Sequence, residues 1–171
     1  MIELISKKII NISSNELKEI YTLKDSFWKH GIIKQKKWFK KNIKNYDICN
    51  ILKYNNKIIG ITILRKRRYF QFKTKKKYLL FDTLIIKKKY RGKKFSLLLM
   101  NFNNFIIIRE NLMSVLICEN NLIKFYKKFL WKRIKNLKIS FNDYNYKSNS
   151  MIFNYKNDFI KKKGILFSLK S

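Results

Sequence analysis

Residues 84–99 read LIIKKKYRGKKFSLLL, and this stretch decides the fold. An apolar run, typical of a buried strand, ends at Ile86 and is followed by a basic loop that contains one glycine, Gly92. From Phe95 onward, apolar residues recur every three or four positions, which predicts a helix that begins near residue 93. Residues 78–108 are therefore predicted to form a strand–loop–helix unit.

The loop of this unit has the features of an anion-binding site. Backbone N–H groups at the start of a helix point toward a bound anion and favour its charge. Gly92 allows the backbone to approach a ligand closely, and Arg91, Lys93 and Lys94 add positive charge. An ordinary basic loop before an amphipathic helix has the same pattern, so this segment alone leaves both interpretations open.

Further strands and helices are predicted on both sides of this unit. We expect strands at residues 2–12, 49–54, 57–65, 78–86, 113–118 and 131–134, late strands near 138–141 and 151–155, and helices at 13–28, 33–43 and 121–129. Ser13 and Glu16 form a capping box at the first helix, residues 54–57 a hairpin turn, and residues 73–77 a charged turn. This order predicts an α/β fold with a mixed sheet.

Composition limits the classes of function. A chain of 171 residues with 46% hydrophobic residues suits one domain with a core, and no apolar run is long enough to span a membrane. The first ten residues, MIELISKKII, lack the apolar run of a secretory signal, which predicts a cytoplasmic protein. Cys49 and Cys118 are expected to be buried structural thiols. With His30 as the single histidine, we expect neither a metal site nor a Ser-His-Asp triad.

The net charge of +31 would ordinarily indicate a nucleic-acid or membrane partner. However, the chain has no Pro or Ala and only four Gly, and it is dominated by Lys, Ile and Asn, residues with AT-rich codons. Lysine also outnumbers arginine, the residue preferred for forked phosphate contacts, and the charge is scattered along the chain. An AT-rich genome therefore explains the charge better than nucleic-acid binding. A basic RNA- or ribosome-associated binding protein is the alternative.

Residues 84–99 resemble the acetyl-CoA signature of the GNAT superfamily of N-acetyltransferases, in which a strand runs into Arg/Gln-x-x-Gly-x-Gly/Ala and a leucine-rich helix. Residues 125–131, FYKKFLW, are similar to the family's second signature, Leu/Phe-Tyr-x-x-x-Gly-Phe. The resemblance implies a mostly antiparallel sheet flanked by helices in a single domain. It also implies an acceptor-side half at residues 1–77, an acetyl-CoA-binding core at 78–135, and C-terminal strands and a tail at 136–171.

The resemblance also implies roles for individual residues. A backbone N–H of Leu84, Ile85 or Ile86 would polarise the thioester carbonyl, and Tyr126 would protonate the departing sulfur of CoA. Asp82, the only carboxylate inside its strand, is the best candidate for the base, with Glu119 as the runner-up. The structural alternatives stay open: Asp82 as a half-exposed strand residue paired with a neighbouring lysine, and Tyr126 as a tyrosine packed in the last helical turn. The residues expected to hold acetyl-CoA, besides those three strand positions, are Arg91, Gly92, Lys93, Lys94, Phe95, Ser96 and Asn120.

Two glycines of the family signatures are replaced in this chain. Lys94 stands at the fourth position of the phosphate signature, where a Cβ crowds the pyrophosphate. Leu130 stands where glycine suits a left-handed helix end. A GNAT fold that has lost turnover is therefore a further alternative.

The acceptor amine is not identified by these motifs, but charge restricts it. With ten Asp and Glu in the whole chain, a polycationic acceptor would be repelled, and a neutral or anionic amine such as an amino sugar on a nucleotide is favoured. A protein N-terminus or a ribosomal partner stays open. Trp28 and Trp38 either line an acceptor pocket or pack in the core, and core packing is the favoured interpretation.

Overall fold

The structure is a computed structural model that describes residues 1–71, 74–134, 149–156 and 165–168. The chain forms two compact units, one of residues 1–65 and 82–103, the other of residues 66–81 and 104–171. Three elements have residues in both units: β3 (Lys57–Gln71), β4 (Thr74–Ile86) and α3 (Phe95–Arg109).

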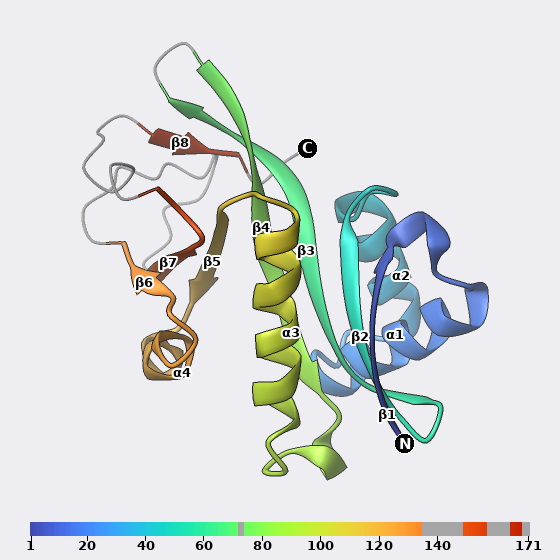
Figure 1. Ribbon diagram of the computed structural model, residues 1–171. Helices are drawn as coiled ribbons and strands as arrows, with labels where there is room; N and C mark the ends of the chain where they lie inside the picture. The colour runs from blue at the N-terminus through green and yellow to red at the C-terminus, as the bar shows by residue number, and fades with distance from the viewer. Residues whose placement is uncertain (72–73, 135–148, 157–164, 169–171) are drawn as a thin grey trace. The chain divides into compact units, whose positions relative to one another are not determined.

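The first unit contains the N-terminal strands and helices (Figure 1). Its elements are β1 (Ile2–Lys8), a 3-10 turn (Ile9–Asn11), α1 (Ser14–Phe27), α2 (Ile32–Asn42), β2 (Ile48–Tyr54), and its parts of β3, β4 and α3. β1 pairs antiparallel with β2, and β2 pairs antiparallel with β3. The predicted capping box is confirmed, because Ser13 and Glu16 each accept a hydrogen bond from the other's backbone N–H. The hairpin turn is confirmed as well, with φ of 47° at Asn55 and 62° at Asn56.

Apolar side chains cover both faces of the strands in this unit. Ile51 and Ile61 belong to a cluster that includes Ile20 of α1 and Phe39 of α2. Leu52, which follows Ile51, and Ile59, which follows Ile58 of the first cluster, pack in another cluster with Ile86 and with Leu99 from α3. Because successive strand residues point to opposite faces, α1 and α2 cover one face and the first part of α3 covers the other.

β3, β4 and α3 approach each other closely at Gly60. A Cβ on Gly60 would lie 2.5 Å from Cδ1 of Ile86, 3.1 Å from the carbonyl oxygen of Ile85 and 3.3 Å from Cδ2 of Leu99. A side chain here would require Cδ1 of Ile86 to move and the other two atoms to shift by a few tenths of an ångström. Gly60 therefore allows β3, the end of β4 and the first part of α3 to pack closely.

A hydrogen-bonded trio of polar side chains is buried between β2, β3 and α3. Nδ2 of Asn50 donates to Oγ1 of Thr62 and to Oδ1 of Asn103, at 3.0 Å each. Oγ1 of Thr62 donates to the same Oδ1 of Asn103 at 2.8 Å. All three residues are fully buried, and Oδ1 of Asn50 and Nδ2 of Asn103 have no partner among the described residues.

The second unit contains the C-terminal strands. Its elements, besides its parts of β3, β4 and α3, are β5 (Ser114–Cys118), a 3-10 turn (Asn120–Leu122), α4 (Ile123–Lys127), β6 (Lys132–Arg133), β7 (Asn149–Phe153) and β8 (Ile165–Phe167). β5 pairs with β4 in parallel, from Leu79↔Ser114 to Phe81↔Leu116. Trp131 is buried and stacks on Phe153, with 5.5 Å between ring centroids.

The sheet has the strand order β1-β2-β3-β4-β5-β7-β6, and β8 pairs with β3. Among the described ladders whose direction is recorded, the β4–β5 ladder alone is parallel. The predicted fold, α/β with a mixed, mostly antiparallel sheet flanked by helices, is therefore confirmed.

The sequence prediction is wrong at the β3–β4 hairpin. β3 continues past residue 65 to Gln71, and β4 begins at Thr74, so residues 74–77 form an exposed strand instead of a charged turn. Buried aromatic side chains hold this extension: the rings of Tyr69 and Tyr78 contact each other and Phe167 of β8. β8, which supplies Phe167 and pairs with the extended end of β3, was not predicted.

Other boundaries shift by a few residues. The first strand ends at Lys8, where a 3-10 turn begins, and α3 begins at Phe95. The predicted helix at 121–129 is shorter, since it divides into a 3-10 turn and α4. The predicted strand near 151–155 corresponds to β7, and the one near 138–141 lies outside the described residues.

The end of α4 adopts a glycine-type conformation without a glycine. Leu130 has φ of 64°, and its side chain is 77% exposed. Its N–H donates to the carbonyl of Lys127, and the N–H of Trp131 donates to that of Tyr126, so the turn closes as a left-handed helix end does. The backbone conformation of the second signature is therefore kept, at the energetic cost of a left-handed leucine.

We expect Leu130→Gly to stabilise the protein by about 0.5–1 kcal/mol, because it relieves the left-handed strain and removes little packing. Thermal or urea unfolding measures this change. Leu122→Gly is the matched control: Leu122 is also exposed, but its φ is −88°, so glycine there should cost about 1 kcal/mol. Equal effects of the two substitutions would contradict the assignment of strain to residue 130.

Candidate active site

The segment between β4 and α3 is a short, ordered loop. The N–H of Lys87 donates to the carbonyl of Ile59 at 2.7 Å, and a 3-10 turn (Lys88–Tyr90) follows. Gly92 and Lys94 then take positive φ values of 78° and 61°. Left-handed residues in a turn direct successive N–H groups toward one side, which creates a concave surface suited to an anion.

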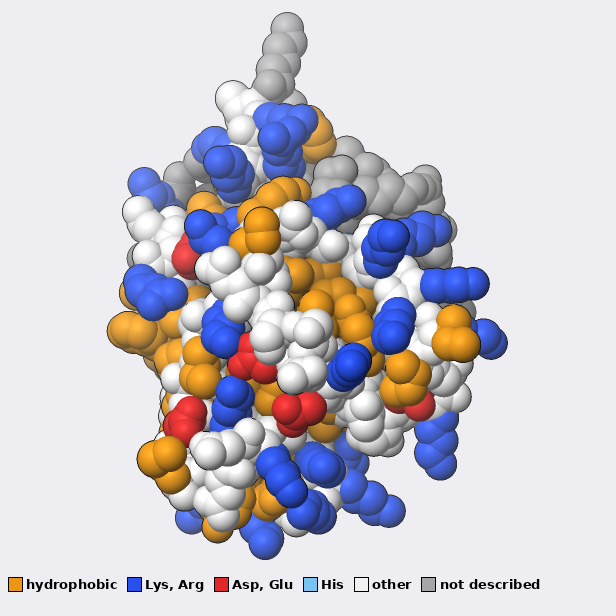
Figure 2. All heavy atoms as spheres, turned by 90° about the vertical axis from the view of Figure 1, so that its right-hand side faces the viewer, with side chains coloured by type: hydrophobic (Ala, Val, Ile, Leu, Met, Phe, Trp, Pro, Cys, Tyr) orange, Lys and Arg blue, Asp and Glu red, His pale blue; other side chains and the backbone are white. Residues whose placement is uncertain are grey.

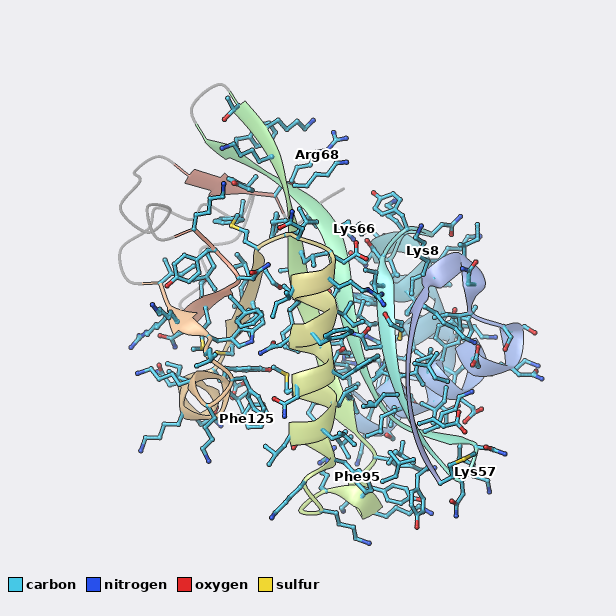
Figure 3. The ribbon with its side chains drawn as sticks, viewed as in Figure 1. Lys8, Lys57, Lys66, Arg68, Phe95 and Phe125 are labelled. Atoms are coloured by element: carbon cyan, nitrogen blue, oxygen red, sulfur yellow. The ribbon has the colours of Figure 1, made fainter. Side chains whose placement is uncertain are left out.

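Three aromatic rings attach this loop to the sheet. Tyr90 of the 3-10 turn lies 5.8 Å from Tyr54 of β2 and 6.0 Å from Phe95, between ring centroids, and Tyr54 lies 6.1 Å from Phe95. Figure 3 shows Phe95 where α3 begins. The sequence did not predict the role of Tyr54 and Tyr90 in this contact, because an aromatic residue beside a turn is not a specific pattern.

Basic side chains surround the start of α3, whose first turn contains no acidic residue. Lys93 and Lys94 are exposed, Ser96 is half-buried, and a Cβ on Gly92 would meet no protein atom within 4 Å. Nε of Arg91 donates to the carbonyl of Ile86 at 3.0 Å, and its guanidinium lies 5.2 Å from the centroid of the Phe27 ring. The arrangement suits an anionic ligand, with open space over Gly92.

Asp82 lies near the C-terminal end of β4, and the sequence shows no sign of its partner. Oδ2 of Asp82 forms an ion pair with Nη1 of Arg65 at 2.5 Å, and Oδ1 accepts a hydrogen bond from the hydroxyl of Thr83. A lysine partner was considered from the sequence; the partner is an arginine.

The alternation of faces along β4 shifts between Asp82 and Ile85. Asp82 lines a pocket beside α1 and α2, and Ile85 packs in the apolar cluster of these same helices. Residues three apart in a regular strand point to opposite faces, so these two contacts indicate an irregularity between them, such as a β-bulge. Leu84 and Ile86 accordingly pack on the α3 side. The predicted carbonyl-polarising segment thus begins two residues after a carboxylate that faces the pocket.

This pocket has a volume of about 500 Å³ and lies wholly within the first unit. It is lined by Lys24, Trp28, His30, Lys34, Gln35, Trp38 and Asp82. Trp38 both contacts the core and lines the pocket, and Trp28 is 36% exposed. The favoured interpretation of the two tryptophans, core packing, is therefore wrong for Trp28 and incomplete for Trp38.

Lys24 is the most unusual residue of the pocket. Only 3% of Lys24 is exposed, and its ammonium lies 4.2 Å from the ring centroid of Trp38 and 4.8 Å from that of Trp28. No hydrogen-bond acceptor or ion-pair partner for this ammonium is found in the described part of the chain. Burial lowers the pKa of Lys24, an effect that attraction to Asp82 opposes. The sequence indicates the burial of Lys24 only through its position, because Lys24 follows Ile20 by one helical turn on the apolar face of α1.

The connection between α1 and α2, which carries two pocket residues, is held by specific hydrogen bonds. Oδ1 of Asp25 accepts from the N–H of Gly31 at 2.7 Å. Nε2 of Gln35, which is buried, donates to the carbonyl of Trp28 at 3.1 Å. These two hydrogen bonds hold the short loop that carries Trp28 and His30. The position of this pocket wall is therefore fixed by contacts within the fold.

Tyr126 belongs to the second unit. It is 8% exposed, and its ring makes a perpendicular contact with Phe81 and a tilted contact with Trp131. Burial, together with the nearby Cys118, raises the pKa of Tyr126 above its usual value, so the hydroxyl keeps its proton at neutral pH. No described residue forms a hydrogen bond with this hydroxyl.

The remaining candidates of the second unit lie at the end of β5. Oδ1 of Asn120 accepts a hydrogen bond from Nδ2 of Asn149 at 2.6 Å, and Glu119 is exposed. Cys118 is a free, buried thiol, as is Cys49 of the first unit, which confirms the expectation for both cysteines. Burial raises the pKa of Cys49 to about 12, so it is not a nucleophile at neutral pH.

Among the described residues, no helix is long and apolar enough to cross a membrane. No group of three or more His, Cys, Asp or Glu side chains among them is arranged to bind a metal ion.

Comparison with solved structures identifies the fold. No protein-family model and no curated protein matches the sequence. The structural neighbours are N-acetyltransferases of the GNAT family. An acyl-CoA N-acyltransferase from Pseudomonas aeruginosa matches with a TM-score of 0.65 and 11% identity, over 89% of this chain and 99% of the other.

Two more neighbours carry informative descriptions. The PaiA N-acetyltransferase from Thermoplasma acidophilum, solved in complex with coenzyme A, matches with a TM-score of 0.57 and 14% identity, over 90% of this chain and 99% of the other. The ribosomal-protein-S18-alanine N-acetyltransferase from Escherichia coli matches with a TM-score of 0.61 and 10% identity, over 100% of this chain and 96% of the other. The chain therefore has the GNAT fold.

We expect Lys24→Met to raise the free energy of unfolding at pH 7 by about 1–2 kcal/mol, because it removes a buried ammonium without a hydrogen-bond acceptor. The pKa of Lys24 is lower in the folded state, so the unfolded wild type binds more protons between that pKa and 10.5. Wild-type stability should therefore rise with pH in this window, and the advantage of the variant should shrink.

Urea unfolding of both proteins from pH 6 to 10.5 measures this difference. Lys36→Met, which changes an exposed lysine of α2 outside the pocket lining, is the control and should alter stability by less than about 0.5 kcal/mol. A destabilised Lys24→Met would show that the two tryptophan rings fully compensate the buried charge.

Proposed function

We propose that this protein transfers an acetyl group from acetyl-CoA to a primary amine. The observation that carries the proposal is the loop before α3, in which left-handed Gly92 and Lys94 precede a helix N-terminus surrounded by basic residues. This loop lies in a fold shared with N-acetyltransferases, one of which was solved with coenzyme A. A pyrophosphate placed over Gly92 would meet backbone N–H groups and positive charge together.

The residues proposed to hold the cosubstrate fall into two groups. Backbone groups of Gly92, Phe95 and Ser96, with the side chains of Arg91, Lys93 and Lys94, would bind the pyrophosphate. Leu84, Ile85 and Ile86 would supply the N–H that polarises the thioester carbonyl, which is worth several kcal/mol when such a donor is fixed in advance. Asn120 stays a candidate for contact with the cosubstrate.

The reaction needs two proton movements. The amine nitrogen attacks the carbonyl carbon, a C–N bond forms as the C–S bond breaks, the nitrogen loses a proton, and the sulfur gains one. Tyr126 is proposed as the acid toward sulfur, since its hydroxyl carries a proton at neutral pH and forms no hydrogen bond with a described residue. Asp82 is proposed as the base, acting directly or through a water, since it faces the pocket near the end of β4.

The proposed acceptor is a small-molecule amine or an amino sugar. Figure 2 shows that Lys and Arg side chains greatly outnumber Asp and Glu on one face of the molecule, where they surround exposed hydrophobic side chains. Such a surface repels polycationic acceptors over roughly 10 Å. A protein N-terminus is the alternative acceptor, a possibility supported by a fold neighbour that acts on a ribosomal protein.

We expect coenzyme A or acetyl-CoA to stabilise the protein by about 2.7 kcal/mol at a hundredfold excess over its dissociation constant. Gly92→Val should abolish most of this gain, because a branched side chain fills the open space over the loop. Gly31→Val is the matched control: Gly31 also has positive φ and open space around it, so it should lose similar intrinsic stability but keep the gain from CoA.

Thermal melting with and without ligand measures both variants. A melting temperature that ignores millimolar acetyl-CoA and desulfo-CoA would contradict the acetyltransferase proposal. If RNA of random sequence stabilised the protein instead, at near-physiological salt, the basic RNA-binding alternative would replace it. CoA binding without turnover on any amine would favour the fold that has lost activity.

We expect Tyr126→Phe to lower kcat by about 10²–10⁴-fold, since it removes the proton proposed for sulfur and keeps the ring. Tyr78→Phe is the control. Tyr78 is a buried tyrosine of the same unit whose hydroxyl donates to the carbonyl of Ser168, so its loss should cost about 1 kcal/mol of stability and leave kcat unchanged. Steady-state kinetics on an amine found by screening measures the loss of kcat, and urea unfolding measures the loss of stability. Together they distinguish a catalytic tyrosine from a structural one. Wild-type turnover in Tyr126→Phe would remove Tyr126 from the mechanism.

A further inference from the structure

We infer that the pocket lined by Lys24, Trp28 and Trp38 is the acceptor site and that it selects amines carrying an anionic oxygen group, a carboxylate or a phosphate. Lys24 is the residue that binds this group. The inference rests on the proposed function for the transfer step, and it names the class of acceptor that the site takes.

The first support is the unsatisfied ammonium of Lys24. An ammonium has three donors, and a buried one ordinarily has hydrogen-bonded or ionic partners. The tryptophan rings at 4.2 Å and 4.8 Å provide cation–π attraction but accept no strong hydrogen bond. The ammonium borders the pocket, so a ligand oxygen placed there would supply the missing acceptor.

The second support is the charge of the pocket lining. Lys24 and Lys34 are cationic, His30 adds a further polar group, and Asp82 is the single acidic residue of the lining. The charge of Asp82 is already matched by the Arg65 guanidinium, and Arg65 also lies 6.0 Å from the Trp38 ring centroid. The pocket lining therefore has an excess of positive charge, which a ligand with an anionic group would neutralise.

The third support is the position and shape of the pocket. Its volume of about 500 Å³ is in the range of small-ligand sites, and two indole rings offer flat apolar walls. Asp82 is the pocket residue that β4 contributes. It lies two residues before Leu84, so roughly 7 Å of strand separates it from the segment proposed to polarise the carbonyl. A ligand with its anion at Lys24 and its amine toward Asp82 would direct the nitrogen to that segment.

Two matched ligand pairs test the inference, because each pair differs in one anionic group. They are L-phenylalanine against L-phenylalaninamide for a carboxylate, and glucosamine 6-phosphate against glucosamine for a phosphate. Binding is followed by the fluorescence of Trp28 and Trp38, with the buried Trp131 of the other unit as background. In the wild type, we expect the anionic member of at least one pair to bind about ten- to hundredfold more tightly.

Substitutions test whether Lys24 causes the preference for the anionic ligand. Lys24→Met should abolish the preference for the anionic member while the protein stays folded, as checked by cooperative melting. Lys36→Met removes the same charge from an exposed position outside the pocket and should keep the preference. A preference in the carboxylate pair alone or the phosphate pair alone supports the inference and identifies the group.

Three results would overturn it: equal binding of both members in both pairs, no binding of either anionic probe at millimolar concentration, or a preference that survives in Lys24→Met. These outcomes are independent of the CoA measurement. If CoA binds and the preference is absent, acetyl transfer stands and the acceptor class is wrong. If the preference depends on Lys24 and CoA does not bind, the pocket binds anions and the transferase proposal fails.

Discussion

The two left-handed residues between β4 and α3 determine where the first N–H groups of α3 point. Gly92 adopts this conformation at little cost, but Lys94 must be forced into it, which costs about 1–2 kcal/mol. The ring contacts among Tyr54, Tyr90 and Phe95 contribute to holding the loop in place. The close approach at Gly60 holds the end of β4 against α3. The strained loop thus depends on ordinary packing beside it.

The sequence predicted this part of the fold well because its signals are local. The apolar run into Ile86, the glycine at 92 and the helical spacing after Phe95 follow from contacts within a few residues. The same holds for the Ser13–Glu16 capping box. Lys94 and Leu130 departed from the expected glycines, but the backbone kept the glycine conformation at both positions. A change of residue type therefore did not mean a change of local structure.

What the sequence did not predict depends on contacts between distant segments. The lysine-rich residues 74–77 were expected to form a turn, yet Tyr69, Tyr78 and Phe167 hold this region as a hairpin, and Phe167 is about 90 residues away from Tyr78. The pairing of Asp82 with Arg65 and the pocket around Lys24 have the same origin. Charge composition was especially uninformative: most lysines of a +31 chain are solvated at little cost, and burial makes Lys24 different from them.

The buried trio of Asn50, Thr62 and Asn103 constrains how α3 is rotated against β2 and β3. The first part of α3 docks through leucine and methionine side chains, and its exposed side also carries apolar residues such as Leu97 and Leu98, so apolar contacts alone leave several rotations of the helix similar in energy. Hydrogen bonds from β2 and β3 to Asn103 are satisfied in one rotation and one axial position, as with a single polar residue in a coiled-coil interface. An apolar trio would leave the helix free to slip, which NMR would reveal as several sets of resonances for α3. Since the helix begins directly after Lys94, its rotation on the sheet also fixes the direction of the N–H groups in its first turn.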